Sequence, residues 1–240
     1  MKKSLVMHVL YAARNIRSGA LFNVLKQYCC GDVLDIGGYD FITMVTRHPA
    51  VQFTTWTTLE RDPRHLPGIK DSRYRAVIGD GEHMSFSDAS FDTVMNIQVL
   101  EHTFEPIRMV KEIARVLRPG GYAIFLIPQT GVLHHPPHHY YNFTRFWIDT
   151  AMRRAGLLMV ERKPLGGRWT TTASHMVYFF LQSFKNVEYS TVEDKRNIFF
   201  FILWPLMALY ALISIPVCMV LSLGDLTEEP NNWLVVARRD

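Results

Sequence analysis

Residues 32–38 read DVLDIGG, an apolar run that ends in an acid and two glycines. Short apolar runs bounded by glycine are typical of buried β-strands. A second run, TTWTTLE at residues 54–60, follows it and ends at another acid, Glu60. A strand, a glycine turn, a helix and then a strand ending in an acid form the opening of a nucleotide-binding α/β fold.

The remaining chain continues the alternation of strands and helices. Further strands are expected at residues 76–80 (a short buried strand), 91–100, 122–128, 157–164 and 231–239. Helices are expected at 4–28, 106–117 and 143–157, the second with Pro106 in its first turn and the third opened by Thr144. The length of 240 residues fits one large α/β domain with extensions.

Composition restricts the partners and the compartment. The net charge of +4 is spread along the chain without a basic block, which argues against nucleic acid and is compatible with an anionic membrane surface. The three cysteines, Cys29, Cys30 and Cys218, form no disulfide framework, so a reducing cytosolic setting is expected. The N-terminal stretch has no sustained apolar core, and no signal peptide is expected.

Residues 197–224 contain no charged side chain. As a helix, this segment is long enough to cross a hydrocarbon core of about 30 Å. It is the strongest compositional feature of the chain and predicts contact with a membrane.

Four segments in a fixed order resemble the class I S-adenosylmethionine-dependent methyltransferases, in particular the small-molecule branch called type 11. They are VLDIGG, LERD, the stretch at 79–102 and RVLRPGGYAIFLIP, and the resemblance covers about residues 31–163 with a return at 231–239. It implies a doubly wound, Rossmann-like, mostly parallel seven-stranded sheet whose last strand is antiparallel. The expected divisions are an amphipathic helical extension (1–30), a methyltransferase core (31–170), an apolar helical insertion (171–228) and the last core strand (229–240).

The resemblance also assigns residues to S-adenosyl-L-methionine. Gly37 and Gly38 allow the backbone to approach the cofactor closely, as glycines do in nucleotide-binding turns. The other expected contacts are Asp35 with the amino group, Glu60 with the ribose hydroxyls, Asp80 and the Gly81 backbone with the adenine, and Asn96 with the methionine part. Taken singly, Asp35 also fits an ordinary strand-end turn, and Glu60 beside Arg61 fits a solvated ion pair.

The glycine turn departs from the family pattern. The family shows D-x-G-x-G-x-G, whereas this chain has Tyr39 and Phe41 at the positions of the later two glycines. Two expectations stay open for Tyr39: that its ring lines the cofactor pocket, or that it blocks it.

The segment PHHYYNFT (137–144) follows the fifth expected strand and resembles a P-H-D-Y-Y-R-F-T motif of bacterial methyltransferases from cell-surface polysaccharide or lipid pathways. His139 stands in place of the acid and Asn142 in place of the arginine. Methyl transfer to oxygen needs alignment and a base near neutral pH, so His138, His139 and Tyr140 are the catalytic candidates. The alternative is a rigid, proline-braced loop capped by Thr144.

No metal is expected at this histidine cluster. The order His-His-Pro-Pro-His-His lacks the helical spacing of four residues and a nearby acidic ligand.

The place of the apolar segment between two core strands determines its expected topology. If the strands at 157–164 and 231–239 share one sheet, the chain between them leaves and returns on the same side, which excludes a single crossing helix. We expect a monotopic or re-entrant element, kinked at Pro205 and Pro216, paired with an apolar helix at 175–184, and with Lys195 and Arg196 at cytoplasmic headgroups. A hydrophobic lid or dimer interface in a soluble enzyme is the alternative.

The sequence therefore predicts a methyltransferase that uses S-adenosyl-L-methionine at the cytoplasmic face of a membrane, with a lipid-linked or saccharide-type oxygen acceptor. The competing hypothesis is a membrane-associated binding or scaffold protein that has lost turnover. Acceptor identity and oligomeric state do not follow from the sequence.

Overall fold

The computed structural model describes residues 19–184 and 196–240, which form two compact units. One unit, the core, comprises the described part of residues 16–128 together with 140–163 and 233–240. The other, the helical unit, comprises residues 129–139 and the described part of 164–232. The N-terminal half of the helix expected at 4–28 lies outside the described residues, and 19–28 are helical.

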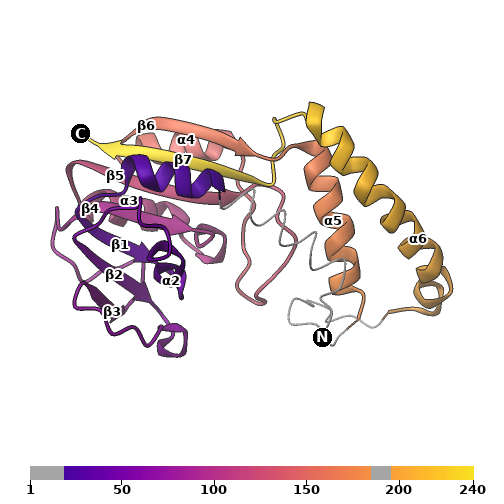
Figure 1. Ribbon diagram of the computed structural model, residues 1–240, viewed down its shortest axis with the longest axis horizontal. Helices are drawn as coiled ribbons and strands as arrows, with labels where there is room; N and C mark the ends of the chain where they lie inside the picture. The colour runs from indigo at the N-terminus through magenta and orange to yellow at the C-terminus, as the bar shows by residue number, and fades with distance from the viewer. Residues whose placement is uncertain (1–18, 185–195) are drawn as a thin grey trace. The chain divides into compact units, whose positions relative to one another are not determined.

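The core is a seven-stranded sheet with the strand order β3-β2-β1-β4-β5-β7-β6. Its strands are β1 (Asp32–Ile36), β2 (Thr55–Glu60), β3 (Tyr74–Ile78), β4 (Phe91–Ile97), β5 (Leu117–Pro128), β6 (Leu157–Leu165) and β7 (Asn232–Arg239). The pairs formed among β1 to β5 are parallel, while β7 is antiparallel to its neighbours (Figure 1). The predicted fold class is confirmed.

Helices cover both faces of the sheet because its central strands are apolar on both sides. In Figure 1, the helix of residues 19–28 lies in front of the sheet and α4 (Arg145–Arg154) lies behind it. Helix α3 (Pro106–Val116) packs on α4, and Ile113 and Ile148 join the core residues of the strands on that face. The Thr144 hydroxyl accepts a hydrogen bond from the Trp147 amide at 3.4 Å and caps α4, as predicted.

Two strands differ from expectation. β3 is displaced to Tyr74–Ile78 and is not buried: it lies at the edge of the sheet, and the Ile78 side chain is 53% exposed. β5 begins at Leu117, five residues before the expected start. Its register against β4 shifts between Phe91 and Thr93, so Leu117 pairs with Phe91 while Tyr122 pairs with Thr93. Residues 118–121, between the expected helix and the expected strand, therefore belong to an irregular part of β5.

The helical unit contains the short helix pair α5 (Arg168–Gln182) and α6 (Ile198–Leu221). The two helices pack on each other, and the Trp204 indole donates a hydrogen bond to the Ser183 hydroxyl at 3.1 Å. The expected pairing of the apolar segment with a preceding helix is confirmed. α6 runs without interruption through Pro205 and Pro216. Of the two headgroup residues expected before it, Lys195 lies outside the described residues.

Candidate active site

Three parallel strands bring the predicted cofactor residues to one edge of the sheet. Asp35 is the penultimate residue of β1, Glu60 is the last residue of β2, and Asn96 is near the end of β4. In the ladder, Ile36 of β1 lies opposite Leu59 on one side and Asn96 on the other. The carboxyl ends of such strands are where ligands bind in open α/β sheets.

These three side chains are buried with oxygen atoms that accept no hydrogen bond from the described residues. The atoms are both carboxylate oxygens of Asp35, Oε2 of Glu60 and Oδ1 of Asn96. Burial, and then the nearby charge of Glu60, raise the pKa of Asp35 well above its usual range. Unpaired buried oxygens are costly, so their gathering at one strand edge indicates a place for a ligand with several hydrogen-bond donors.

The orientation of Asn96 depends on a methionine of helix α3. Asn96 Nδ2 donates to the sulfur of Met109 at 3.1 Å, which leaves Oδ1 as the group without a partner. In the sequence, Met109 is one of the apolar positions of a helix, and no local pattern indicates this second contact.

The two glycines of the turn have separate reasons to be glycine. Gly37 has a φ of +63°, and its amide donates to the Leu59 carbonyl at 2.8 Å. A Cβ on Gly38 would lie 1.9 Å from Oδ2 of Asp35, and one on Gly37 would lie 2.8 Å from Val99. The backbone of this turn therefore packs directly against the carboxylate and against the segment after β4.

Tyr39 contacts His65, a residue near Glu60 that the sequence analysis did not identify. It stacks on His65 with ring centroids 4.2 Å apart, and its hydroxyl lies 3.0 Å from His65 Nε2. His65 Nδ1 in turn lies 4.0 Å from Oε1 of Glu60. Burial, then the charges of Glu60 and Asp62, raise the pKa of Tyr39. His65 is not part of a sequence motif, so only the folded chain reveals its contact with Tyr39.

Asp80 and Gly81 lie in the turn after β3. One Asp80 oxygen accepts the Glu82 amide at 2.9 Å and the other pairs with Arg61 at 3.2 Å. Gly81 lies close to the same methionine as Asn96, since a Cβ on it would be 2.6 Å from the Met109 methyl group. The pair of Arg61 with Asp80 was not expected from the sequence, where Arg61 is only the neighbour of Glu60.

The residues present fit S-adenosyl-L-methionine. Its ammonium group and two ribose hydroxyls can donate the hydrogen bonds that the unpaired oxygens of Asp35 and Glu60 do not receive from the described residues. The turn at Gly38 has no room for a side chain between its backbone and the Asp35 carboxylate.

The catalytic candidates are divided between the two units. His138 and His139 belong to the helical unit, whereas Tyr140 belongs to the core. The Tyr140 amide donates to the Glu101 carbonyl at 2.8 Å, which fixes it beside the end of β4. Within its own unit, His139 Nδ1 accepts the His134 amide at 3.2 Å.

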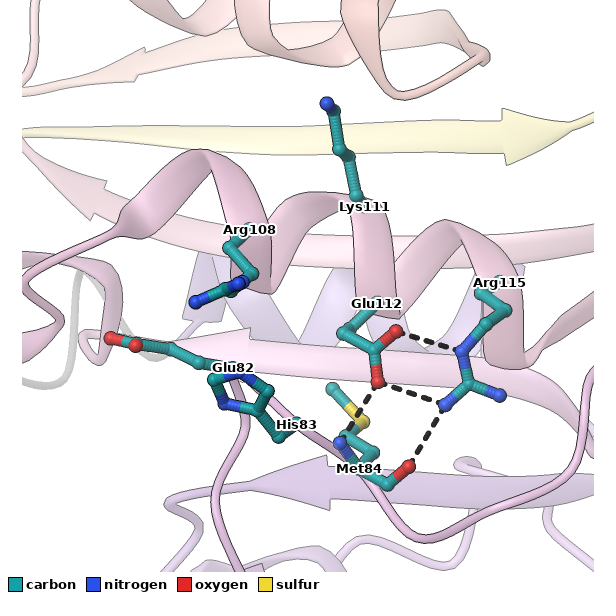
Figure 2. Close-up of a pocket in the computed structure, with 7 residues that line it drawn as sticks. All are labelled: Glu82, His83, Met84, Arg108, Lys111, Glu112 and Arg115. Atoms are coloured by element: carbon teal, nitrogen blue, oxygen red, sulfur yellow. Dashed lines mark hydrogen bonds and ion pairs between the residues drawn. The ribbon is translucent and has the colours of Figure 1, made fainter.

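A depression of about 510 Å³ along helix α3 serves a different purpose. Figure 2 shows Glu112 and Arg115 bound to one another and to the backbone of Met84. Glu112 Oε2 accepts the Met84 amide at 2.8 Å, while Arg115 donates to the Met84 carbonyl at 2.9 Å. The charged groups are thus paired with each other and fasten the 84–88 segment to α3, so we assign this depression a structural role.

Part of the chain is similar to known methyltransferases. A methyltransferase domain model (type 11) matches residues 43–125. A phthiotriol/phenolphthiotriol dimycocerosates methyltransferase of Mycobacterium tuberculosis is 38% identical over 96 residues, which are 36% of this chain and 32% of that protein. A protein of Mycolicibacterium smegmatis named as a probable S-adenosylmethionine-dependent methyltransferase is 33% identical over 117 residues, 46% of this chain and 43% of that protein. The chain thus spans a third to under half of these relatives.

Among solved structures, the Haemonchus contortus phosphoethanolamine N-methyltransferase 2 superposes with a TM-score of 0.54 at 15% identity. The superposition covers 88% of this chain and 49% of that chain. At this identity the likeness concerns the fold, and it agrees with the strand order described above. Residues 43–125 of this chain thus match the methyltransferase domain family, and the fold and the partial relatives agree with that match.

Proposed function

We propose that this protein transfers a methyl group from S-adenosyl-L-methionine to an oxygen of a lipid-linked or saccharide-type acceptor at the cytoplasmic face of a membrane. The observation that carries the cofactor part is the group of buried, unpaired oxygens of Asp35, Glu60 and Asn96 at adjoining strand ends. When bound, the cofactor supplies an electrophilic methyl group on a sulfonium.

The residues have distinct proposed roles toward that cofactor. Asp35 accepts from its ammonium group and Glu60 accepts from the ribose hydroxyls, with Tyr39 beside the ribose. Asp80 and the Gly81 backbone face the adenine, and Asn96 faces the methionine part. Charged acceptors and donors of this kind form the stronger hydrogen bonds, which fits a polar ligand held at a water-excluding edge.

His138 is the proposed base for the acceptor hydroxyl, with His139 and Tyr140 as the neighbouring candidates. An imidazole has a pKa near the working pH and can take a proton from a hydroxyl aligned for in-line attack. Removal of such a base lowers turnover by about 10²-fold or more.

The membrane part rests on the pattern of side chains around α6. Its three buried residues, Ala208, Ala211 and Cys218, are all small. Its large apolar side chains are exposed, among them Phe199, Ile202, Leu206, Leu209, Ile213, Val217 and Val220. A helix in a water-soluble core has the reverse arrangement, whereas small residues at the helix contact and large ones outside are typical of helices in lipid.

Length and flanking groups also support lipid. The 24 residues of α6 extend about 36 Å at 1.5 Å per residue, comparable to the hydrocarbon core of about 30 Å. Arg196 lies just before the helix with its guanidinium 5.1 Å from the Phe200 ring centre, as an interfacial cation would. A dimer interface would account for the one stripe that contains Phe199, Leu206 and Ile213. It would not account for the exposure of Phe201, Leu212 and Met219, which lie on a different face of α6.

The acceptor class draws on both the helix and the relatives. The Mycobacterium tuberculosis relative acts, by its name, on phthiotriol and phenolphthiotriol dimycocerosates. An exposed apolar helix in the same chain as the methyltransferase core would give access to an acceptor that resides in lipid.

Calorimetric titration with S-adenosyl-L-methionine separates the enzyme from the scaffold hypothesis. We expect binding by the wild type and about 1–3 kcal/mol weaker binding by Glu60→Gln, because the ribose hydroxyls lose a charged acceptor. Arg64→Gln, in an exposed pair with Asp62, is the control and should bind normally. Absence of heat with the wild type would favour the scaffold.

Two further measurements address the acceptor and the membrane. Incubation of membranes with radiolabelled cofactor should yield a labelled lipid product. His138→Ala should lower the rate at which this product forms, while cofactor affinity stays the same.

Flotation with phosphatidylcholine–phosphatidylglycerol vesicles should recover the wild type in the vesicle fraction, and a Leu206→Glu/Ile213→Glu variant should float less. A wild type that stays in the aqueous fraction would contradict the membrane proposal.

A further inference from the structure

Residues 129–139 are called the histidine loop below. The first residues of this loop are bound to helix α5. His175 Nε2 donates to the Thr130 carbonyl at 2.8 Å, and Gln182 Nε2 donates to the Leu133 carbonyl at 2.9 Å. The hydroxyls of Thr130 and Thr171 lie 3.1 Å apart. Three side chains of one helix thus reach the first four to five residues of the loop.

These contacts occupy one side of α5, and its buried residues lie on another. Residues 171, 175 and 182 follow the spacing of four and seven that places side chains on one helix face. The buried residues of α5, Ala173 and Val177, are each two positions from His175, about 200° around the helix at about 100° per residue. α5 therefore contacts both the loop and the apolar helix.

The other side of the segment is held by the chain that leaves α6. The Gln129 amide donates to the Asn231 carbonyl at 3.0 Å, and the Thr130 hydroxyl donates to the Pro230 carbonyl at 3.2 Å. Beyond it the loop is braced internally, with His134 Nδ1 2.9 Å from the Val132 carbonyl and the rings of His134 and His139 4.5 Å apart. These contacts connect the segment around Leu133 with His134 and His139.

We propose that α5 couples lipid binding by α6 to the conformation of the histidine loop, and that His175 and Gln182 are positioning residues for it. This inference rests on the proposed function, since it makes the acceptor-side loop part of the lipid-seated unit. In this proposal the enzyme takes its acceptor from the bilayer. The histidine loop becomes ordered when α5 and α6 bind lipid.

Hydrogen–deuterium exchange of the full chain tests the coupling. With phosphatidylcholine–phosphatidylglycerol vesicles, we expect the amides of the histidine loop in the wild type to exchange roughly fivefold more slowly than without them, as for a locally ordered segment. His175→Ala and Gln182→Ala should float with vesicles as the wild type does but lose this protection. His175→Gln, which keeps a donor, should restore part of it.

Thr172→Ala is the matched control, because the Thr172 hydroxyl donates to the Arg168 carbonyl of its own helix at 2.9 Å. It should keep the protection of the loop. Loop exchange that does not respond to vesicles in a wild type that floats overturns the coupling alone. Failure to float overturns the membrane proposal as well, while calorimetry with the cofactor reports on the methyltransferase site independently.

Discussion

At the scale of single residues, Tyr39 explains how the glycine turn tolerates its departure from the family pattern. Its φ of +50° lies in the left-handed region, where glycine is the usual residue. Such a conformation costs a non-glycine residue about 1–2 kcal/mol, and the stack on His65 offsets part of this. The backbone therefore follows the path of a glycine turn while the ring is turned toward Glu60.

Asp35 couples cofactor binding to pH-dependent stability. Because burial raises its pKa in the folded chain, the folded protein keeps a proton that the unfolded chain releases above its pKa of about 4. The free energy of unfolding without cofactor should therefore fall as pH rises from about 4 toward the folded pKa.

We expect Asp35→Asn to flatten this dependence, to raise the unfolding free energy at pH 7 by about 1 kcal/mol, and to weaken cofactor binding by about 1–3 kcal/mol. Thermal unfolding between pH 4 and 8 and calorimetry measure both effects. Normal cofactor affinity in this variant would show that Asp35 is not part of the site.

Gly38 gives a steric test of the same site. Its missing Cβ would overlap Oδ2 of Asp35 at 1.9 Å, so Gly38→Ala should displace the carboxylate, lower the unfolding free energy by about 1–3 kcal/mol and abolish measurable cofactor binding. Gly68→Ala is the control, since no atom lies within 4 Å of a Cβ at that position. Equal behaviour of the two variants in denaturation and calorimetry would contradict the packing described.

At the scale of elements, helix α5 is capped by a residue from the far end of the helical unit. The Asp225 carboxylate accepts the amides of Trp169 and Thr170 at 2.7 and 3.0 Å and the Thr170 hydroxyl at 2.7 Å. Burial raises the pKa of Asp225, but the bonds from Thr170 and Trp169 outweigh it and lower the pKa overall. This stabilisation is present above the unfolded pKa and is lost as pH falls through the folded pKa.

We expect Asp225→Ala to destabilise the start of α5 by about 1 kcal/mol, the usual effect of losing an N-terminal cap. Faster amide exchange at residues 169–171 in detergent would show it. Glu228→Ala is the control, because only the backbone carbonyl of Glu228 is bonded, by Gln129. Unchanged exchange in Asp225→Ala would mean that the cap does not hold the helix.

At the scale of the whole molecule, the residues that begin and follow the helix pair contact each other within the helical unit. The Arg168 amide donates to the Leu226 carbonyl at 3.0 Å, and the Arg168 guanidinium pairs with Glu229 at 3.0 Å. This contact supports the expectation that the apolar segment does not carry the chain to the other side of a membrane.

Single cysteines at positions 168 and 228, in a background with Cys30 replaced by serine, should react with an impermeant maleimide from the same side of sealed vesicles. Labelling from opposite sides would contradict a monotopic or re-entrant helix pair.

Because Arg168 and Leu226 are in contact, joining residues 167 and 228 by a short Gly-Ser bridge should also yield a soluble core that binds the cofactor. A variant that lacks only residues 197–224 should be less soluble than this bridged core, because it keeps α5 with its buried residues Ala173 and Val177.

Sequence patterns alone predict the alternation of strands and helices, the acids at the ends of β1 and β2, the capping of α4 by Thr144, and the apolar character of α6. Each of these is a local property: apolar periodicity, a glycine after a strand, or a hydroxyl before a helix is visible within a few residues. The resemblance then placed Asp35, Glu60 and Asn96 at one sheet edge, where parallel strands must end together.

Other features appear only in the folded chain: the edge position of β3, the left-handed Tyr39 beside His65, the cap of α5 by Asp225, and the attachment of the histidine loop to α5 through His175. These features join residues that lie 26, 45 or 55 positions apart. Such contacts have no period along the chain, because they follow from how packed elements approach one another rather than from the propensity of any one of them.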